Sequence, residues 1–368
     1  MRERIYGLDV WRAILLLGGP IVHAAWAAEL ITKYSGRFVS DLVYASSTFR
    51  MQCFFLIAGF LAAHGQAKQK EWLSRRILQL GVPLVFIWLV FLLPVEIVTS
   101  RFHEDGSLFQ SFTPYNYHDP GHLWFLITLI AVSLLMAWVQ ISDIVDIDKI
   151  NQINPYRLLS LALIAFVLLT AASLFLSSHI KRNAVFVLLT LSPTCVGAYI
   201  VGFSIERVPR VVETIKITKA AYFGPIAVVI ATLVHNGLLI SNNLSTFTTY
   251  WCACFISAVA TSFMCLFVMQ SALRITKRFR LVAILSDASY SIYVLHFPII
   301  MLLGTYVGFR QLTIAPVFIT LTVLSLGFSI AAHRLLIRRV ALFAFLVNGK
   351  YRLAPRHRLS SASENLRT

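Results

Sequence analysis

Apolar side chains recur along this chain in long runs that are separated by short polar segments. A helix needs about 20 mainly apolar residues to cross the hydrocarbon core of a bilayer. The pattern therefore predicts an all-α, polytopic integral membrane protein with about ten transmembrane helices. The predicted spans lie near residues 10–30, 44–64, 77–99, 121–142, 157–178, 184–203, 219–240, 250–273, 282–307 and 313–333.

The composition supports a membrane protein. Hydrophobic residues make up 58% of the 368 positions and charged residues only 13%, whereas soluble domains have about 25% charged residues. The chain has 32 Lys and Arg against 16 Asp and Glu. In a soluble protein this excess would indicate nucleic-acid binding, but here the positive-inside rule explains it. We expect the lipid bilayer as a partner and no nucleic acid.

The basic residues are distributed unevenly between the two sides of the predicted membrane domain. An even number of spans places both termini on one side, and the segments on that side carry 24 of the 32 basic residues. The segments on the other side carry seven. Because cytoplasmic loops are enriched in Lys and Arg, we expect both termini to be cytoplasmic. Residues 1–350 are expected to form a single transmembrane domain, and residues 351–368 a polar, disordered cytoplasmic tail.

The first predicted span contains three ionisable residues, Asp9, Arg12 and His23. A charged side chain at the bilayer centre costs about 2.5 kcal/mol or more, so such residues indicate a functional site. Arg12 and His23 are eleven residues apart, which is about three helical turns and about 16 Å along the axis. Their side chains therefore point the same way at different depths. Asp9 is three residues before Arg12 and can pair with it.

Three arginines follow in and after the second span. Arg50 lies in Phe49-Arg50-Met51-Gln52, and its simplest interpretation is a side chain that snorkels to the outer interface. Arg75 and Arg76 precede the third span. They either fix the topology or hold phosphates of a cytoplasmic cofactor, for which guanidinium groups are well suited.

Two further pairs of residues are candidates for a binding site. His122 and Trp124 open the fourth span; a tryptophan there is typical of the interfacial belt, but the pair could also form the floor of a sugar-binding cleft. Tyr293 and His296 share one face of the ninth span, where a histidine is either a structural hydrogen-bonding group or part of a site. No HxH or HExxH spacing occurs in the histidine-containing loop at about 100–120, and no metal is expected.

Taken in order, these motifs resemble the acyltransferase-3 family of membrane-bound O-acyltransferases. The resemblance covers residues 7 to 350 and is carried by Asp9-x-x-Arg12 with His23, Phe54-Phe55 to Gly59-Phe60, Arg75-Arg76 before Pro83, His122-Leu123-Trp124-Phe125-Leu126, and Ser291-Ile292-Tyr293 to His296. Ala58 stands where the family usually has a serine, so a hydroxyl at this position cannot be required.

The resemblance implies an acyltransferase, of the class that transfers groups other than aminoacyl groups, in a bacterial inner membrane. The donor would be a cytoplasmic acyl-CoA, either succinyl-CoA or acetyl-CoA, and the acceptor a hydroxyl of a periplasmic or cell-envelope glycan. In this scheme His23 is the general base, and Arg12, held by Asp9, binds the donor. The remaining candidates are donor-binding Arg75 and Arg76, and acceptor-binding or supporting Arg50, His122, Trp124, Tyr293 and His296.

A transporter or flippase is the alternative, with Arg12, His23 and His296 forming a substrate or proton pathway. An inverted repeat between the two halves would favour it, but the motifs of the first, second and fourth spans have no counterpart later in the chain. A non-catalytic scaffold with structural intramembrane charges is a third possibility.

Overall fold

The computed structural model describes residues 5–33, 37–64, 69–101, 121–141, 150, 152–179, 192–240, 247–277, 280–306 and 312–350. Within these ranges every long element is a helix, as the hydrophobic pattern predicts. The principal helices are α1 (Tyr6–Thr32), α2 (Arg37–His64), α3 (Gln69–Ile87), α4 (Leu93–Arg101), α6 (Trp124–Ile141), α8 (Pro155–His179), α10 (Ser192–Arg207), α11 (Pro209–Ile217), α12 (Phe223–Ile240), α13 (Phe247–Arg274), α14 (Arg280–Tyr306), α15 (Ile314–Ala332) and α16 (Ala341–Asn348).

Each of the ten predicted spans contains a helix within the described residues. Among the described residues, eight helices have the length and apolar character of a span. The fourth predicted span corresponds to the shorter apolar helix Trp124–Val139. The sixth corresponds to α10, where the described helix begins at Ser192. The polytopic all-α fold is confirmed, with eight candidate spans in the described part of the chain.

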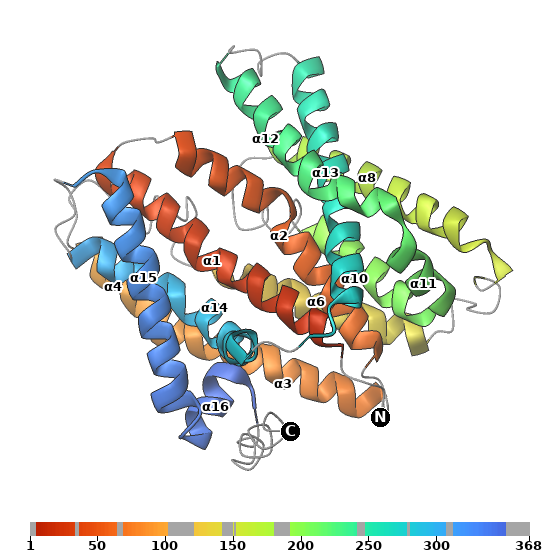
Figure 1. Cartoon of the computed structure of the whole chain (residues 1–368). Coiled ribbons are helices and arrows are strands. Elements are labelled where there is room, and N and C mark those ends of the chain that lie inside the picture. The colour runs from red at the N-terminus through yellow and green to blue at the C-terminus, as the bar shows by residue number, and fades with distance from the viewer. Residues whose placement is uncertain are drawn as a thin grey trace.

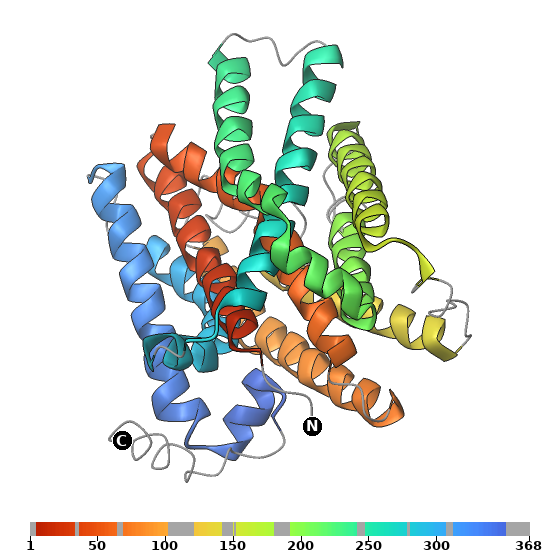
Figure 2. The same ribbon diagram turned by 45° about the vertical axis from the view of Figure 1, so that its right-hand side comes forward.

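Helix α1 lies inside the bundle and packs against α2, α13, α14 and α15. On its far side, α2 packs against α10, while α12 and α13 lie side by side as a pair that rises above the other helices (Figures 1 and 2). The α3 helix packs against α6 and α16. It continues into α4 through a π-helical turn at Trp88–Leu92. The central position of α1 explains why its polar residues are shielded from lipid.

Small residues let the helix backbones approach closely. A Cβ atom on Gly59 of α2 would lie 2.0 Å from the Tyr199 carbonyl oxygen of α10, and one on Gly202 of α10 would lie 1.9 Å from the Leu56 carbonyl oxygen. Membrane helices use such positions because backbones in contact gain van der Waals packing that lipid cannot supply. The two glycines therefore fix the crossing of α2 and α10.

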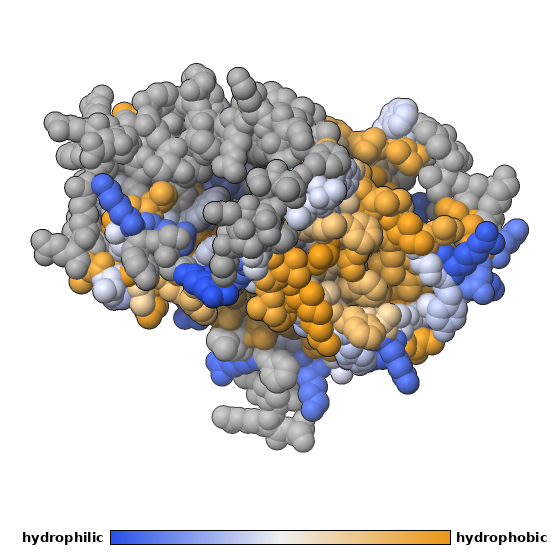
Figure 3. All heavy atoms as spheres, turned by 90° about the horizontal axis from the view of Figure 1, so that it is seen from above, coloured by the Kyte–Doolittle hydropathy of each residue, from blue (hydrophilic) through white to orange (hydrophobic). Residues whose placement is uncertain are grey.

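The outer surface of the bundle is apolar. Ile164 on α8, Val229 on α12 and Val323 on α15 are between 57% and 60% exposed. Figure 3 shows a continuous orange area between hydrophilic residues at its edges. Soluble monomers rarely expose apolar patches of this extent, so this surface is the one that contacts lipid.

Two predicted boundaries need comment. The second helix begins at Arg37, about seven residues before the start predicted from hydropathy, because the polar first turns still continue the helix. The tail, residues 351–368, lies outside the described residues, so its predicted disorder stays a prediction, as does the single-domain boundary at residue 350. The described chain ends in α16, after which Gly349 (φ 60°) packs against Gln79 of α3.

Candidate active site

Three histidines that are far apart in the sequence meet inside the bundle. His23 comes from α1, His122 from the 3-10 turn η2 (Gly121–Leu123) that starts α6, and His296 from α14. The ring centroids of His23 and His296 are 5.2 Å apart, those of His122 and His296 5.3 Å, and those of His23 and His122 6.3 Å. His122 and His296 are buried, while His23 keeps partial exposure. We call these three residues the histidine cluster.

The imidazoles of the cluster are mostly without hydrogen-bond partners. Nδ1 of His296 lies 3.1 Å from the Ile292 carbonyl oxygen, so this nitrogen carries the proton and donates it. Nε2 of His296, Nδ1 of His23 and both ring nitrogens of His122 are buried and form no hydrogen bond within the described ranges. Buried polar groups are usually paired. A cluster with several unsatisfied nitrogens is suited to binding a ligand.

Aromatic side chains hold the cluster in place. The Tyr293 hydroxyl donates a hydrogen bond of 2.7 Å to the His122 carbonyl oxygen and so ties η2 to α14. The centroid of the Phe297 ring lies 5.1 Å from that of His23 and 4.8 Å from that of His122. The predicted proximity of Tyr293 and His296 is confirmed, with ring centroids 5.6 Å apart. Trp124 is partly buried against the hydrophobic core.

Arg50 lies beside the histidine cluster and not at the membrane interface. Its exposure is only 9%, and its side chain crosses α1 at Gly18 and Gly19. A Cβ on Gly18 would lie 2.9 Å from Arg50 Cδ, and one on Gly19 would lie 3.0 Å from Nη1. The prediction that Arg50 snorkels to the interface is therefore wrong, because the glycine pair on α1 opens a path into the bundle interior.

Arg12 and Asp9 form the predicted pair at the start of α1, with Arg12 Nη1 3.6 Å from Asp9 Oδ1. Arg12 remains 35% exposed, so it can contact a ligand without losing its partner. Eleven helical residues place it about 16 Å along the axis from His23. Arg75 is on the surface, 74% exposed and 3.2 Å from Glu71, while Arg76 is partly buried.

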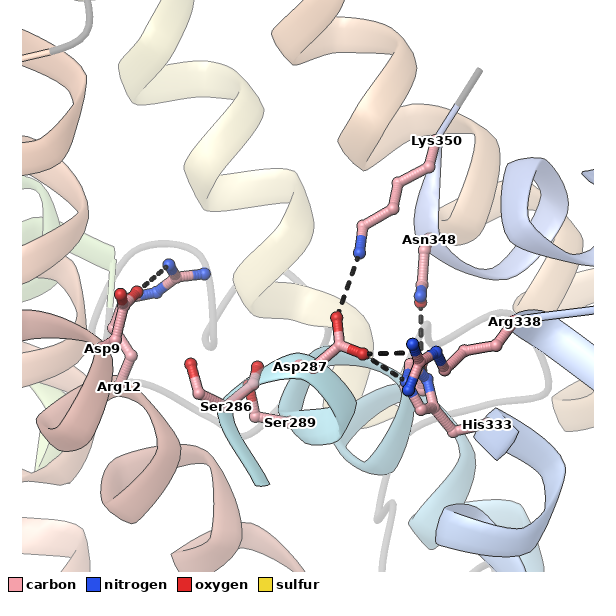
Figure 4. A network of polar contacts seen from close by, with 10 residues as sticks. Asp9, Arg12, Ser286, Asp287, Ser289, His333, Arg338, Asn348 and Lys350 are labelled. Carbon is pink, nitrogen blue, oxygen red and sulfur yellow. Dashed lines mark hydrogen bonds and ion pairs between the residues drawn. The ribbon is translucent and has the colours of Figure 1, made fainter. Parts of the chain in front are cut away.

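A polar network near this end of the bundle did not emerge from the sequence. Asp287 of α14 contacts Nε2 of His333 at 3.3 Å, Arg338 Nε at 3.7 Å and Lys350 Nζ at 3.8 Å. The Ser291 hydroxyl lies 2.8 Å from His333 Nδ1 and donates to Asn348 Oδ1 at 2.9 Å. Figure 4 shows Asp9 and Arg12 on one side of the first turns of α14, and Asp287 pointing to the other side. The sequence feature that could have indicated this network is Asp287, an aspartate within an apolar run.

The described residues contain no group of three or more His, Cys, Asp or Glu that could hold a metal ion. The three imidazoles of the histidine cluster do not form such a group, and Arg50 adds a positive charge beside them. The acidic and histidine residues of the loop at about 100–120 lie outside the described ranges.

Comparison with known proteins identifies the family of this chain. Residues 5–334 match the family model described as an acyltransferase domain, of the acyltransferase-3 type. The proteins named glucans biosynthesis protein C from Escherichia coli K12 are 25% identical over 150 residues, and those from strain SMS-3-5 are 25% identical over 153 residues. These matches cover 37% of this chain and 39% of the relatives, so the chain spans less than two-fifths of their length. No solved structure was found to match. Since the family model covers most of the chain, from before Asp9 to beyond His333, the protein belongs to the acyltransferase-3 family.

Proposed function

We propose that this protein is a membrane-bound O-acyltransferase that moves an acyl group from a cytoplasmic acyl-CoA to a hydroxyl of a glycan on the other side of the inner membrane. Family membership supports the reaction class. The observation that carries the proposal is the histidine cluster, in which a partly exposed His23 lies beside the buried imidazoles of His122 and His296, whose Nε2 atoms form no hydrogen bond among the described residues.

Arg12 is proposed to bind the donor. Its guanidinium is oriented by Asp9 and stays accessible, and a guanidinium can contact phosphate or carbonyl oxygens with two parallel hydrogen bonds. Arg75 and Arg76 would add positive charge for the phosphates of the coenzyme. The axial distance of about 16 Å from Arg12 to His23 is one that a pantetheine arm can span, so the acyl group can reach His23 while the nucleotide stays at the entrance.

His23 is proposed to be the general base, because it is the member of the cluster that keeps partial exposure. A neutral imidazole is the usual group for this step near neutral pH. His23 takes the proton from the acceptor hydroxyl, and the oxygen attacks the carbonyl carbon of the thioester. The new C–O bond forms, the C–S bond breaks, and the coenzyme leaves as a thiolate that recovers a proton.

The acceptor is proposed to be a glucan or a related cell-envelope glycan. The support is the name of the Escherichia coli relatives, glucans biosynthesis protein C. His122, Trp124, Tyr293 and His296 would line the acceptor side. The acyl group is succinyl or acetyl.

The reaction is tested with purified protein in lipid nanodiscs, supplied with acetyl-CoA or succinyl-CoA and a glucan oligosaccharide. Free coenzyme thiol and the mass of the glycan are measured. We expect release of coenzyme together with an O-acylated product, both lost in His23→Ala. His235→Ala is the matched control, since His235 lies on α12 away from the cluster and stacks on Tyr44. A folded wild-type protein that releases no coenzyme and moves the glycan across vesicles unchanged would instead be a transporter.

The orientation proposed from the basic residues places both termini in the cytoplasm. A reporter protein that matures only in the cytoplasm, fused after Thr368, should be active. The same reporter inserted in the segment between α1 and α2 should be inactive. The reverse result would place Arg12 at the periplasmic entrance and contradict delivery of a cytoplasmic donor.

A further inference from the structure

Arg50 is a buried cation with no acidic partner among the described residues. No carboxylate lies within 4.0 Å of its guanidinium among the described residues, and its buried Nε donates no hydrogen bond there. Removing a charge from water costs several kcal/mol unless an opposite charge and hydrogen bonds compensate it. A side chain that could have reached the interface by snorkelling is instead held inside the bundle.

Other charged groups in the bundle are treated differently. Asp9 has Arg12 at 3.6 Å, and the buried Glu206 has His64 at 3.2 Å. Within the protein, Asp9 therefore has a counter-charge and Glu206 a histidine partner. Arg50 lies beside the histidine cluster with no such partner among the described residues, so we expect a ligand to supply the negative charge.

The space next to Arg50 is shared with His296. A Cβ on Gly19 would lie 3.0 Å from Arg50 Nη1 and 3.6 Å from His296 Nε2. The guanidinium and the unpaired imidazole nitrogen therefore face the same small volume, which exists because Gly19 has no side chain. His296 in turn contacts His23. A ligand that reaches this side of α1 would therefore meet both Arg50 and the histidine cluster.

We propose that Arg50 binds the negative charge of the reacting acyl group; this inference rests on the proposed acyl transfer. Attack of the acceptor oxygen moves the carbonyl electron pair onto oxygen, and the resulting oxyanion is one source of negative charge. When the C=O bond re-forms, that pair returns and the thiolate leaves. Preorganised donors aimed at such an oxyanion lower the barrier strongly in a site that excludes water. The other source is the terminal carboxylate of a dicarboxylic acyl group, to which a guanidinium can donate two hydrogen bonds.

Two variants distinguish the oxyanion from the terminal carboxylate as the negative charge that Arg50 binds. They are Arg50→Gln and Arg50→Lys, each assayed with acetyl-CoA and with succinyl-CoA. If Arg50 stabilises the oxyanion, Arg50→Gln should lower kcat with both donors by about 10²-fold to 10³-fold. If it binds a carboxylate, KM for succinyl-CoA should rise by about 10-fold to 100-fold, with little change for acetyl-CoA. Arg50→Lys keeps the charge without the forked geometry and should recover part of the loss.

Gly19→Ala is the second test, because it keeps Arg50 and fills the volume between Arg50 and His296. It should reduce turnover in the same donor-dependent way as Arg50→Gln. Arg280→Gln, at the exposed start of α14, is the control for removing a surface cation and should behave as wild type. Thermal unfolding in detergent is measured for every variant.

Three results would be decisive against the proposal. One is a folded Arg50→Gln protein with wild-type kcat and KM for both donors. Another is a loss of rate in the Arg50 and Gly19 variants that merely follows a loss of folded protein, which would make Arg50 a structural residue. The third is a folded Gly19→Ala protein with unchanged kinetics. If wild-type protein transfers no acyl group to any acceptor, the proposed function itself fails, which is a different outcome.

Discussion

The imidazole rings of His23 on α1 and His296 on α14 lie edge to face with their centroids 5.2 Å apart. The Nδ1 proton of His296 is engaged by the Ile292 carbonyl oxygen, so its Nε2 is the free acceptor and lies against α1 near Gly19. Each helix contributes one histidine to the bundle interior, and their contact brings residues that are distant in the sequence into one candidate site.

His296→Ala should lower kcat by about 10-fold to 100-fold, because the variant removes the ring that packs against His23 and an acceptor nitrogen within the site. Acyl transfer is measured as coenzyme release under saturating donor. A folded His296→Ala protein with wild-type turnover would assign His296 a purely structural role. The His235→Ala variant serves as the control for loss of a histidine elsewhere.

Arg12→Lys should raise KM for acyl-CoA by about 10-fold or more, since lysine keeps the charge but loses the two-pronged geometry of the guanidinium. Asp9→Asn should have a smaller effect in the same direction, because it leaves Arg12 in place without its counter-charge at 3.6 Å. Steady-state kinetics with varied donor distinguish KM from kcat. Equal KM values in wild type and Arg12→Lys would show that Arg12 does not bind the donor.

Gly59→Ala should destabilise the bundle by about 2 kcal/mol or more, since the added Cβ would lie 2.0 Å from the Tyr199 carbonyl oxygen and the backbones of α2 and α10 must move apart. Gly237→Ala on α12 is the matched control, with no atom within 4 Å of its Cβ position. It should leave stability unchanged or raise it by about 1 kcal/mol. Thermal unfolding in detergent measures the stability of both variants. An equal loss of stability in Gly59→Ala and Gly237→Ala would contradict the packing explanation.

Ser291→Ala should destabilise the fold by about 1–3 kcal/mol, because it leaves buried His333 Nδ1 and Asn348 Oδ1 without the hydroxyl that joins them. The exposed Ser74→Ala is the control. Hydrogen exchange should increase in α16, which Asn348 anchors to α14. Unchanged protection in α16 would mean that its packing against α3 and the remaining polar contacts hold this helix without the Ser291 hydroxyl.

Hydrophobic periodicity was enough to predict the helices, because the need for about 20 apolar residues per span leaves a strong local signal. Of the ten predicted spans, eight correspond to helices of membrane-spanning length within the described residues, and the fourth and sixth correspond to the described helices Trp124–Val139 and α10. Local spacing also predicted the Asp9–Arg12 pair and the shared face of Tyr293 and His296 correctly. Both pairs lie three residues apart on one helix, where geometry follows from the helical repeat.

The environment of Arg50 shows where sequence reasoning failed. A lone arginine near a helix end is compatible with snorkelling, and only the position of the neighbouring helix decides otherwise. Residue spacing along α1 does not show which side chain of another helix lies against Gly18 and Gly19. The Asp287–His333 contact was missed for the same reason, since its residues come from different helices.

The sequence by itself determined that this is a helical membrane protein, which ionisable residues enter its spans and which family those residues resemble. These properties are encoded within single helices, by composition and by the 3.6-residue repeat. The tertiary structure alone decided that His23, His122 and His296 meet, and that Arg50 lies beside them with no carboxylate partner in the described part of the chain. Those relationships depend on how α1, α2, η2 and α14 pack against one another. Contacts between helices that are distant in the sequence do not produce a periodic pattern of residues, so the sequence does not reveal them.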